Sequence, residues 1–441
     1  MGQSWPRVIR DPVHNLIFFE DNSCDRLLLD LIDAKEFQRL RRIKQLGMSE
    51  LVFPGANHSR FAHSLGVMNV ARRILNRLKA TPEQQLIVLS AALLHDVGHG
   101  PFSHAFEKVT GVNHEDRTRQ IIRDPDTEVN QRLTAIDPQL PESIERFFMS
   151  DEEQSGHGSI PPYLAYVVSS QLDADRFDYL LRDSHSAGIG YGKFDLDWLI
   201  NHLCVDTSRN RLYLERKSLL TVEEYVFARY HMYQMVYFHK ATRAAEVMLR
   251  LLFRRFKELL CACESPEAIQ KIVPDAPGAV VSIFRKPDEV DLAQYLSLDD
   301  AVLSSFMLLC TKAEDRVLND LSTGLINRHL YKAIDVTDED PAEIPRFRNE
   351  IGLHLDKNHD HTQYIIEEDR PADTPYKVYD PDAEKPAQSI YVENSHGKPE
   401  ELSEISAPVR ELKNRKVLYR YYLPEHLRSE IEAIKKSIWG E

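Results

Sequence analysis

The strongest chemical signal in the sequence is a segment that holds three histidines and an aspartate within ten residues: Leu93-Leu-His95-Asp96-Val-Gly-His99-Gly-Pro-Phe-Ser-His104. The residues before it are strongly apolar, so burial of these polar side chains would cost free energy unless a ligand satisfied them. A divalent cation does so, because it binds imidazole nitrogens and carboxylate oxygens directly. A His-Asp pair by itself is a weak signal that is common on surfaces, but this clustering favours a metal site.

Two other segments add candidate ligands. His63 follows Ser59-Arg60-Phe61-Ala62 at the start of an apolar stretch, and Asp173-Ala-Asp175-Arg176 offers acids on a predicted helix. Taken alone, His63 is more often a satisfied core or surface histidine than a ligand. Imidazole together with carboxylate suits Fe, Mn, Zn, Ni or Co better than Mg alone.

Helices must position these segments. The apolar run Gln84–His95 follows Thr81-Pro82-Glu83, which supplies a helix cap, a first-turn proline and an acid. The glycines and proline of Gly98-His-Gly-Pro101 end this helix. The other elements predicted before residue 335 are helices from Tyr163 to about Asp183 and from Val222 to Phe256, and an exposed loop over residues 150–162.

After about residue 335 the helical pattern gives way to a mixed one. An acidic linker, Asp335–Pro341, precedes short segments with strand-like patterning. We therefore predict a mainly α protein, with a helical core over residues 1–335 and a small α+β region over residues 336–441. The elements predicted in the second region are strands at Ile351–Leu355, Tyr364–Glu367, Tyr376–Tyr379, Ser389–Val392 and Val417–Tyr422, and a helix from Pro424 to Trp439.

The composition limits the partners and the compartment. A formal net charge of −14 over 441 residues argues against a protein that coats nucleic acid, although a few Arg and Lys can still hold a small anion. Five scattered cysteines argue against a disulfide framework, and Cys261-Ala-Cys263 has no further zinc ligands at the usual spacing. Because the sequence shows neither a signal-peptide pattern nor an apolar run of membrane length, we expect a soluble, cytoplasmic protein without membrane contact.

The order His63, His95-Asp96, Asp175 resembles the H…HD…D metal motif of the HD phosphohydrolase superfamily. Residues 52–67, 95–104 and 173–183 are similar to its SAM- and HD-domain dNTP triphosphohydrolase branch, which includes a mammalian enzyme and bacterial dNTPases. The similarity runs from about Ile9 to residue 335, with the HD motif region at about 50–185, and continues more loosely to the end without a SAM domain. The resemblance implies a helical HD-domain core, a divalent metal held by His63, His95, Asp96 and Asp175, and hydrolysis of a dNTP to deoxynucleoside and triphosphate.

The resemblance also implies roles for residues around the metal. His104 would act at the α-phosphate with His99 as its companion, and His114 would be a third active-site histidine. Histidine titrates near neutrality, so it can protonate the departing 5′-oxygen. Glu107 stands where the family usually has the Asp that orients the counterpart of His104. As a structural alternative, His99 and His104 would only support the metal ligands.

The remaining implied residues would bind the substrate. Close packing against the sugar would reject a 2′-hydroxyl, which would clash or lack a hydrogen-bond partner. The alternative for the two tyrosines among them is plain core packing. The residues are Arg60 and Arg229 for the phosphates, Arg176 where the family often has Lys, Gln45 and Asp183 for the 3′-hydroxyl, and Tyr179 and Tyr237 for the sugar.

An effector site and an assembly follow from the same resemblance. The family counterparts of Asp33, Gln38 and Arg41 help to form a guanine-nucleotide activator site between subunits. A GTP or dNTP effector and a homodimer or homotetramer are therefore expected. Arg10 replaces a family Asn and Glu215 replaces a family Arg near the second effector site, which leaves nucleotide activation open.

Two other functions compete with the dNTP triphosphohydrolase. One is an HD-type phosphatase or phosphodiesterase that acts on nucleoside monophosphates or cyclic nucleotides. The other is a nucleic-acid-binding regulatory protein with a vestigial HD site, which the four-ligand set and the acidic composition oppose. The sequence leaves the metal, the preferred base and the biological role (control of dNTP pools or defence against phage) open.

Overall fold

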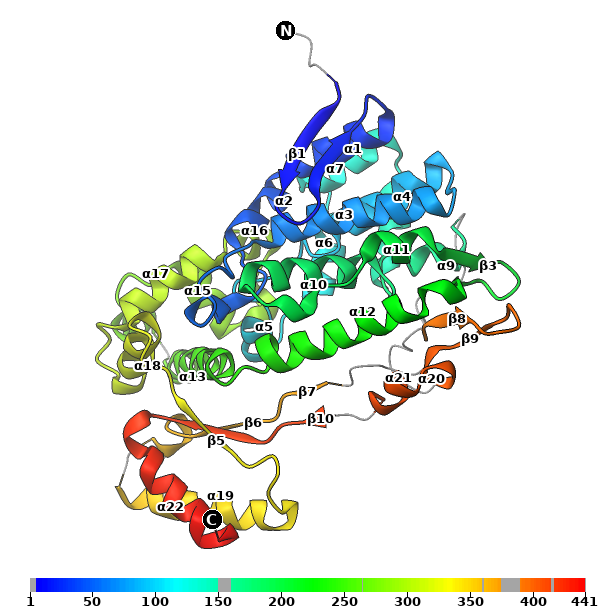
Figure 1. Ribbon diagram of the computed structural model, residues 1–441. Coiled ribbons are helices and arrows are strands. Elements are labelled where there is room, and N and C mark those ends of the chain that lie inside the picture. Colours follow the sequence, from blue (N-terminus) through cyan, green and yellow to red (C-terminus); the bar gives the residue numbers. More distant parts are fainter. Residues whose placement is uncertain are drawn as a thin grey trace.

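The computed structural model describes residues 5–149, 160–263, 265–358, 361–373, 389–413 and 416–440. In the described residues, most helices form one large body, and a row of short strands lies between this body and two helices near the C-terminus, as Figure 1 shows. The prediction of a mainly α protein is confirmed. The helices up to residue 335 are α1 Ser23–Ile32, α2 Lys35–Arg39, α3 Arg60–Arg77, α4 Pro82–Leu94, α5 His104–Thr110, α6 His114–Arg123, α7 Glu128–Ile136, α8 Leu140–Glu145, α9 Pro162–Ala165, α10 Ala174–Ala187, α11 Leu196–Asn201, α12 Leu219–Met232, α13 Lys240–Ala262, α14 Pro266–Ile272, α15 Gly278–Arg285, α16 Leu292–Leu296, α17 Asp300–Cys310 and α18 Arg316–Ile326. The later helices are α19 Ile344–Asn358, α20 Leu402–Ile405, α21 Ala407–Glu411 and α22 Arg428–Trp439.

The helix predicted at residues 84–95 is α4. Thr81 caps it, and the Gln84 side chain returns a hydrogen bond to the Thr81 backbone, which makes a complete capping box. The helix ends at His95, so the two residues of the His-Asp pair stand where α4 stops. Helix α3 packs against both α4 and α10, and apolar residues of all three belong to one buried cluster.

A glycine allows α3 and α10 to approach closely. A Cβ atom at Gly66 of α3 would collide with the side chains of Asp178 and Arg182 of α10. Both of these side chains are fully buried and hydrogen-bonded to each other. The absence of a side chain at residue 66 therefore sets the distance between the two helices.

The predicted helix at 163–183 is wrong as a single element, because the chain forms α9 and then α10 with a break between them. In the break, Asp173 accepts hydrogen bonds from the backbone N–H groups of Ser170 and Arg176, and Ser170 accepts one from Leu172. Such local side-chain bonds compete with helical ones. They place Asp175 in the first turn of α10.

The predicted helix at 222–256 is also wrong as one element. It consists of α12, a π-helical turn at Tyr233–Tyr237, and α13. His239 separates the turn from α13 and caps α13 through Nδ1, which accepts from the Ala241 N–H group. Turns of the π type often mark functional positions, and this one carries Tyr237.

The strands form small sheets, and two of the hairpins were not predicted because each strand is only a few residues long. In the described residues, the sheet orders are β1-β2, β3-β4-β8-β9, β5-β11-β6 and β10-β7. β8 pairs in parallel with β4, so residues beyond 335 extend a sheet of the helical body, and the division at residue 335 stays a prediction. The strands are β1 Arg7–Asp11, β2 Asn15–Phe19, β3 Leu203–Asp206, β4 Arg211–Leu214, β5 Lys332–Asp335, β6 Glu367–Asp369, β7 Ala372–Asp373, β8 Tyr391–Glu393, β9 Pro399–Glu401, β10 Lys416–Val417 and β11 Arg420–Leu423.

The C-terminal predictions had mixed outcomes. The strand predicted at Ile351–Leu355 is wrong, because Phe347, Ile351 and Leu355 follow helical spacing and bury one face of α19 against β11 and α22. The strand predicted at 364–367 begins only at Glu367. β8 and β11 overlap the strands predicted at 389–392 and 417–422, and α22 starts four residues after the predicted helix start. The strand predicted at 376–379 and most of the loop predicted at 150–162 lie outside the described residues.

Among the described residues, no helix is both long and apolar enough to cross a membrane.

Substitution of Gly66 tests the close contact between α3 and α10. We expect Gly66→Ala to lower the free energy of unfolding by about 1–3 kcal/mol, because the added methyl group must displace a fixed ion pair. Urea denaturation followed by circular dichroism measures this change. Gly352→Ala is the matched control, since its Cβ would meet open space in α19 and should leave stability unchanged or raise it by up to about 1 kcal/mol. Equal stability of Gly66→Ala and the parent would contradict the packing argument.

Candidate metal centre

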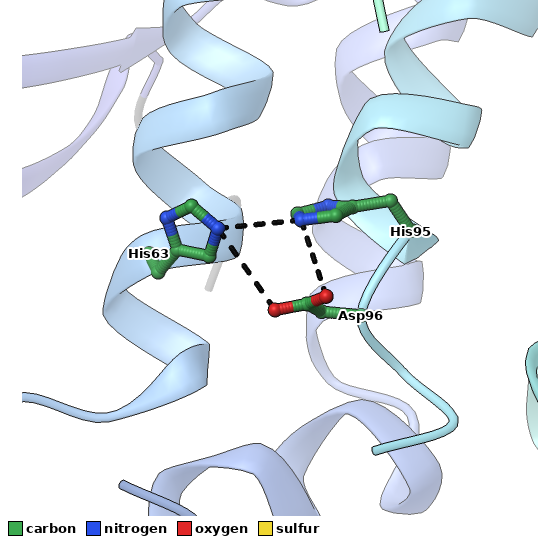
Figure 2. Close-up of side chains that lie close together, drawn as sticks. All are labelled: His63, His95 and Asp96. Carbon is green, nitrogen blue, oxygen red and sulfur yellow. Dashed lines mark hydrogen bonds and ion pairs between the residues drawn. The ribbon is translucent and has the colours of Figure 1, made fainter. Parts of the chain in front are cut away.

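Three helices bring the four predicted ligands together, from α3, the end of α4 and the first turn of α10. The Nε2 atom of His63 lies 3.3 Å from Nε2 of His95, 3.9 Å from Oδ2 of Asp96 and 3.0 Å from Oδ1 of Asp175. The Nε2 atom of His95 lies 3.4 Å from Oδ1 of Asp96 and 3.8 Å from Oδ1 of Asp175. Figure 2 shows both imidazoles and the Asp96 carboxylate pointing toward one another. His63, His95 and Asp96 therefore offer ligand atoms close enough together to hold one cation, and Asp175 lies beside both imidazoles.

Hydrogen bonds on the far side of each imidazole fix its orientation. In His95, Nδ1 lies 2.8 Å from the carbonyl oxygen of Ala92, which can only accept, so Nδ1 carries the proton and Nε2 faces the centre. In His63, Nδ1 lies 2.8 Å from Oδ2 of Asp178. Both Nε2 atoms thus face the centre, and a metal that binds Nε2 of His63 would replace the proton shared with Asp175.

Asp178 belongs to a buried network that the sequence did not reveal. Its Oδ1 atom lies 2.6 Å from Nε2 of His14, and Arg182 donates two hydrogen bonds of 2.9 Å to the same carboxylate. Arg182 also donates to Asp11, so the turn of the β1-β2 hairpin is tied to α10 and, through Asp178, to His63. The signal that could have identified the network is the helical spacing of Asp175, Asp178 and Arg182 on one face of α10.

The charges of the centre favour a cation. Burial alone would raise the pKa of Asp96, but Arg60, His95 and His99 hold that pKa well below its usual range. Burial likewise opposes ionisation of Asp175, yet the hydrogen bond with His63 lowers its pKa. Burial alone would lower the pKa of His63, whereas hydrogen bonds with Asp175 and Asp178 raise it to about 10. Both carboxylates are therefore ionised, and the donor set fits a divalent metal.

Arg60 links the centre to the segment that follows α4. Its guanidinium is paired with the carboxylate of Asp96, and its Nε and Nη2 atoms donate to Oγ of Ser103 at 3.0 and 2.8 Å. His99 approaches Asp96 from another side, with Nε2 at 3.2 Å from Oδ1. Besides the two histidines of the centre, Asp96 therefore contacts Arg60 and His99.

A second histidine cluster stands next to the centre. His99 and His114 stack with ring centroids 3.8 Å apart, and His114 Nδ1 lies 2.6 Å from Oε1 of Glu107. Burial and the nearby Arg60 guanidinium hold the pKa of His99 well below its usual value. Glu107 therefore orients His114. His104 is the first residue of α5, but its side chain lies outside the described part, so its contact with Glu107 stays a prediction.

The residues predicted to meet the sugar also come together. Asp183 accepts a hydrogen bond of 2.7 Å from the Tyr237 hydroxyl and lies 2.7 Å from Nε2 of His58. The Tyr179 and Tyr237 rings make an edge contact with centroids 6.4 Å apart. Gln45 donates its backbone N–H to His58, and its Oε1 atom is buried without a hydrogen-bond partner in the described part of the chain. His58, which the sequence did not single out, joins Gln45 to Asp183.

The arginines predicted to bind phosphate differ in their surroundings. Arg176 sits at the start of α10, where it is paired with Asp173 and donates to the Ser170 carbonyl. Arg229 of α12 is buried, with its guanidinium carbon 4.8 Å from the ring centroid of Tyr233. Helices α10 and α12 pack together, so both arginines belong to the same side of the helical body as Asp175.

The three predicted effector residues lie near one another at the surface. Gln38 donates to the carbonyl of Ile32, next to Asp33 at the end of α1, and accepts from Arg41 Nε at 2.8 Å. The Arg41 guanidinium lies over the ring of Phe61, 3.6 Å from its centroid. Their role in binding a nucleotide stays a prediction.

Comparison with known proteins places these residues in a family context. The HD domain matches residues 60–134 and the HD associated region matches residues 194–272. The uncharacterized protein YwfO of Bacillus subtilis is 36% identical over 427 residues, which cover 96% of this chain and 93% of that protein. The deoxynucleoside triphosphate triphosphohydrolase SAMHD1 of Gallus gallus is 31% identical over 284 residues, 56% of this chain and 45% of the relative. The crystal structure of a phosphohydrolase from Bacteroides thetaiotaomicron has a TM-score of 0.77 at 28% identity and covers 96% of this chain and 100% of that one.

Asp178 offers a test of how His63 is held. We expect Asp178→Asn to weaken Mn²⁺ binding by about 10–100-fold, because the amide no longer fixes the proton on Nδ1 of His63. Isothermal titration calorimetry measures the affinity. The matched control is Asp25→Asn, which weakens another buried Asp–Arg pair, with Arg72, and has no described contact with the four proposed ligands. Equal losses of affinity in both variants would point to general destabilisation instead.

Proposed function

Because the chain belongs to the HD-domain phosphohydrolase family, we propose that it is a metal-dependent deoxynucleoside triphosphate triphosphohydrolase. The reaction would convert a dNTP and water to a deoxynucleoside and triphosphate. The observation that carries the proposal is the convergence of His63, His95, Asp96 and Asp175, next to the Arg60–Ser103 contact and the Asp183–Tyr237 pair. Relatives named deoxynucleoside triphosphate triphosphohydrolase support the choice of substrate.

The chain's own residues divide the chemistry between them. A divalent metal held by the four ligands would supply positive charge at the α-phosphate and make water more acidic. Arg60, Arg176 and Arg229 would neutralise the triphosphate, since guanidinium groups bind phosphate oxygens in a bidentate manner. Water oxygen forms a bond to the α-phosphorus while the bond to the 5′-oxygen breaks.

The leaving 5′-oxygen needs a proton, which we assign to His104 at the start of α5. His99 and His114 would complete the acid-base group, with Glu107 fixing the orientation of His114 through its 2.6 Å contact. His104 and Glu107 are three residues apart in α5, so the proposed proton donor is about one helical turn from the carboxylate that contacts His114.

Selection of the sugar would rest on Asp183 and the tyrosines. Asp183 can accept from a 3′-hydroxyl, as Gln45 can through its unpartnered Oε1 atom. Tyr237 is held in place by its hydrogen bond to Asp183 and would leave no room for a 2′-hydroxyl. The substrate would therefore be a deoxynucleotide.

The surface cluster of Asp33, Gln38 and Arg41 would bind a GTP or dNTP effector, together with residues from a second copy of the chain. A homodimer or homotetramer is the assembly that such a shared site requires. We propose a cytoplasmic location, in keeping with free cysteines.

The reaction itself tests the proposed function. We expect the protein to release triphosphate from at least one of the four dNTPs in the presence of Mn²⁺, Fe²⁺, Co²⁺ or Mg²⁺, assayed with and without GTP by ion chromatography. Orthophosphate from deoxynucleoside monophosphates without triphosphate from dNTPs would favour a phosphatase instead. Metal-free protein that binds single-stranded nucleic acid in a salt-sensitive way would favour a regulatory protein.

Removal of one ligand tests the metal centre. We expect Asp96→Ala to lower turnover by at least about 100-fold and to abolish metal binding, because it removes the carboxylate of the His63, His95 and Asp96 group. Metal content by mass spectrometry and the rate of triphosphate release measure these effects. Asp116→Ala, an exposed residue of α6 paired only with Arg119 among the described contacts, should match the parent in both. An active Asp96→Ala variant would reject the centre.

Substitution of Tyr237 tests sugar selection. We expect Tyr237→Ala to reduce the preference for dGTP over GTP, expressed as a ratio of kcat/KM values, by about 10-fold or more, because it removes the wall against the 2′-hydroxyl. Tyr213→Ala on β4 serves as an aromatic control that should leave the ratio unchanged. An unaltered ratio in Tyr237→Ala would assign the selection to other residues.

A further inference from the structure

The chain between α4 and α5 adopts an unusual conformation. Phe102 and Ser103 have φ angles of 50° and 49°, in the left-handed region that residues other than glycine rarely occupy. Such residues keep this conformation only when their surroundings impose it. Since α5 begins at the next residue, the turn at Phe102–Ser103 decides where α5 starts and therefore where Glu107 lies.

A short segment at the junction of α16 and α17 imposes this conformation. The carboxylate of Asp300 accepts the Phe102 N–H at 2.9 Å, and the Tyr295 hydroxyl donates to the Gly98 carbonyl at 2.7 Å. Arg39 donates to the carbonyls of Leu298 and His99, each at 2.8 Å, and so connects the two segments. Residues 98–103 are thus held at three points along their backbone.

The same carboxylate also holds a second segment that borders the site. Its other oxygen, Oδ2, accepts the Lys44 N–H at 2.9 Å, and the adjacent Asp299 lies 2.5 Å from Nε of Arg42. Lys44 precedes Gln45, whose backbone N–H donates to the carbonyl of His58, and the His58 ring contacts Asp183. One buried carboxylate therefore fixes the backbone of both the histidine segment and the segment of Gln45.

The position of Asp300 in the sequence makes this contact informative. Residues 295–300 lie outside both regions that match the family's domains, 60–134 and 194–272. A carboxylate that is 6% exposed and accepts two backbone N–H groups from distant segments could be replaced by apolar side chains if it only filled space. Instead, each of its two oxygen atoms accepts a hydrogen bond from a different segment of the proposed site.

We propose that Asp300 is a positioning residue for the phosphohydrolase reaction: through Phe102 and Lys44 it sets the relative placement of the acid-base histidines and the sugar contacts, without contacting substrate or metal. The inference rests on the proposed function. It assigns to Asp300 a larger effect on turnover than on metal affinity, because neither of the backbone groups that it holds belongs to a proposed metal ligand.

The test uses the full-length protein and the variant Asp300→Asn, which keeps the size of the side chain but presents an amide NH₂ to one of the two N–H groups. Hydrogen exchange followed by mass spectrometry should be faster by about 10-fold or more in peptides covering 42–47 and 98–107. The kcat should fall by about 10–100-fold, while KM and the Mn²⁺ affinity stay within about 3-fold of the parent. Tyr295→Phe, which removes a single hydroxyl, should change exchange at 98–107 and kcat in the same direction by about 3-fold.

Asp315→Asn is the matched control, because the Asp315 carboxylate likewise accepts a backbone N–H, that of Leu318 in α18, but has no described contact with either segment. It should lower stability without altering exchange at 98–107 or kcat. Unchanged exchange in Asp300→Asn, unchanged kcat despite faster exchange, or a fall in Mn²⁺ affinity that parallels kcat would each overturn the inference. An inactive parent rejects the proposed function and the catalytic part of this inference with it, whereas an active parent with unaltered Asp300→Asn kinetics rejects this inference alone.

Discussion

The contact between His63 and Asp178 is the constraint on which the rest of the structure depends. It joins two buried polar side chains across α3 and α10, and each gives the other a partner that burial requires. Asp178 is in turn balanced by Arg182 and His14, so a chain of charges and hydrogen bonds runs from the N-terminal hairpin to the proposed metal ligands. Because Gly66 lets the helices approach, the chain closes within hydrogen-bonding distance.

The proposed site draws on parts of the chain that lie far apart in sequence. The proposed metal ligands come from α3, the end of α4 and α10, and the stacked histidines come from the segment around α5 and α6. The proposed sugar contacts come from α10 and the π-helical turn before α13. Each part is held by a buried polar group rather than by apolar packing alone. Buried polar groups favour one arrangement of the helices, because any arrangement that left one of them without its hydrogen-bond partner would cost free energy.

The sequence predicted the parts of the site whose chemistry is local. The density of histidine in 95–104 and the capping residues of α4 were readable directly, and the resemblance supplied the order of the ligands. The partners of those residues were not readable, because His14, Asp178 and Asp300 meet their targets only after the helices pack. The break before α10 escaped prediction for a similar reason: Asp173 and Ser170 replace helical bonds by local ones, which a pattern of apolar residues does not show. At Ile351–Leu355, β-branched and apolar residues suggested a strand, whereas packing against β11 and α22 selected the helical spacing.

The parallel pairing of β4 with β8 has a consequence for the order in which the chain folds. Leu214 and Val392 are register partners although 178 residues separate them, which makes this the most non-local strand pairing among the described residues. Closure of so long a loop is slow, and β8 is synthesised long after β4. Until β8 arrives, the β3-β4 hairpin exposes one row of unpaired backbone groups, and such an edge is prone to join another chain. A nascent or truncated chain is therefore vulnerable to aggregation at the free edge of β4.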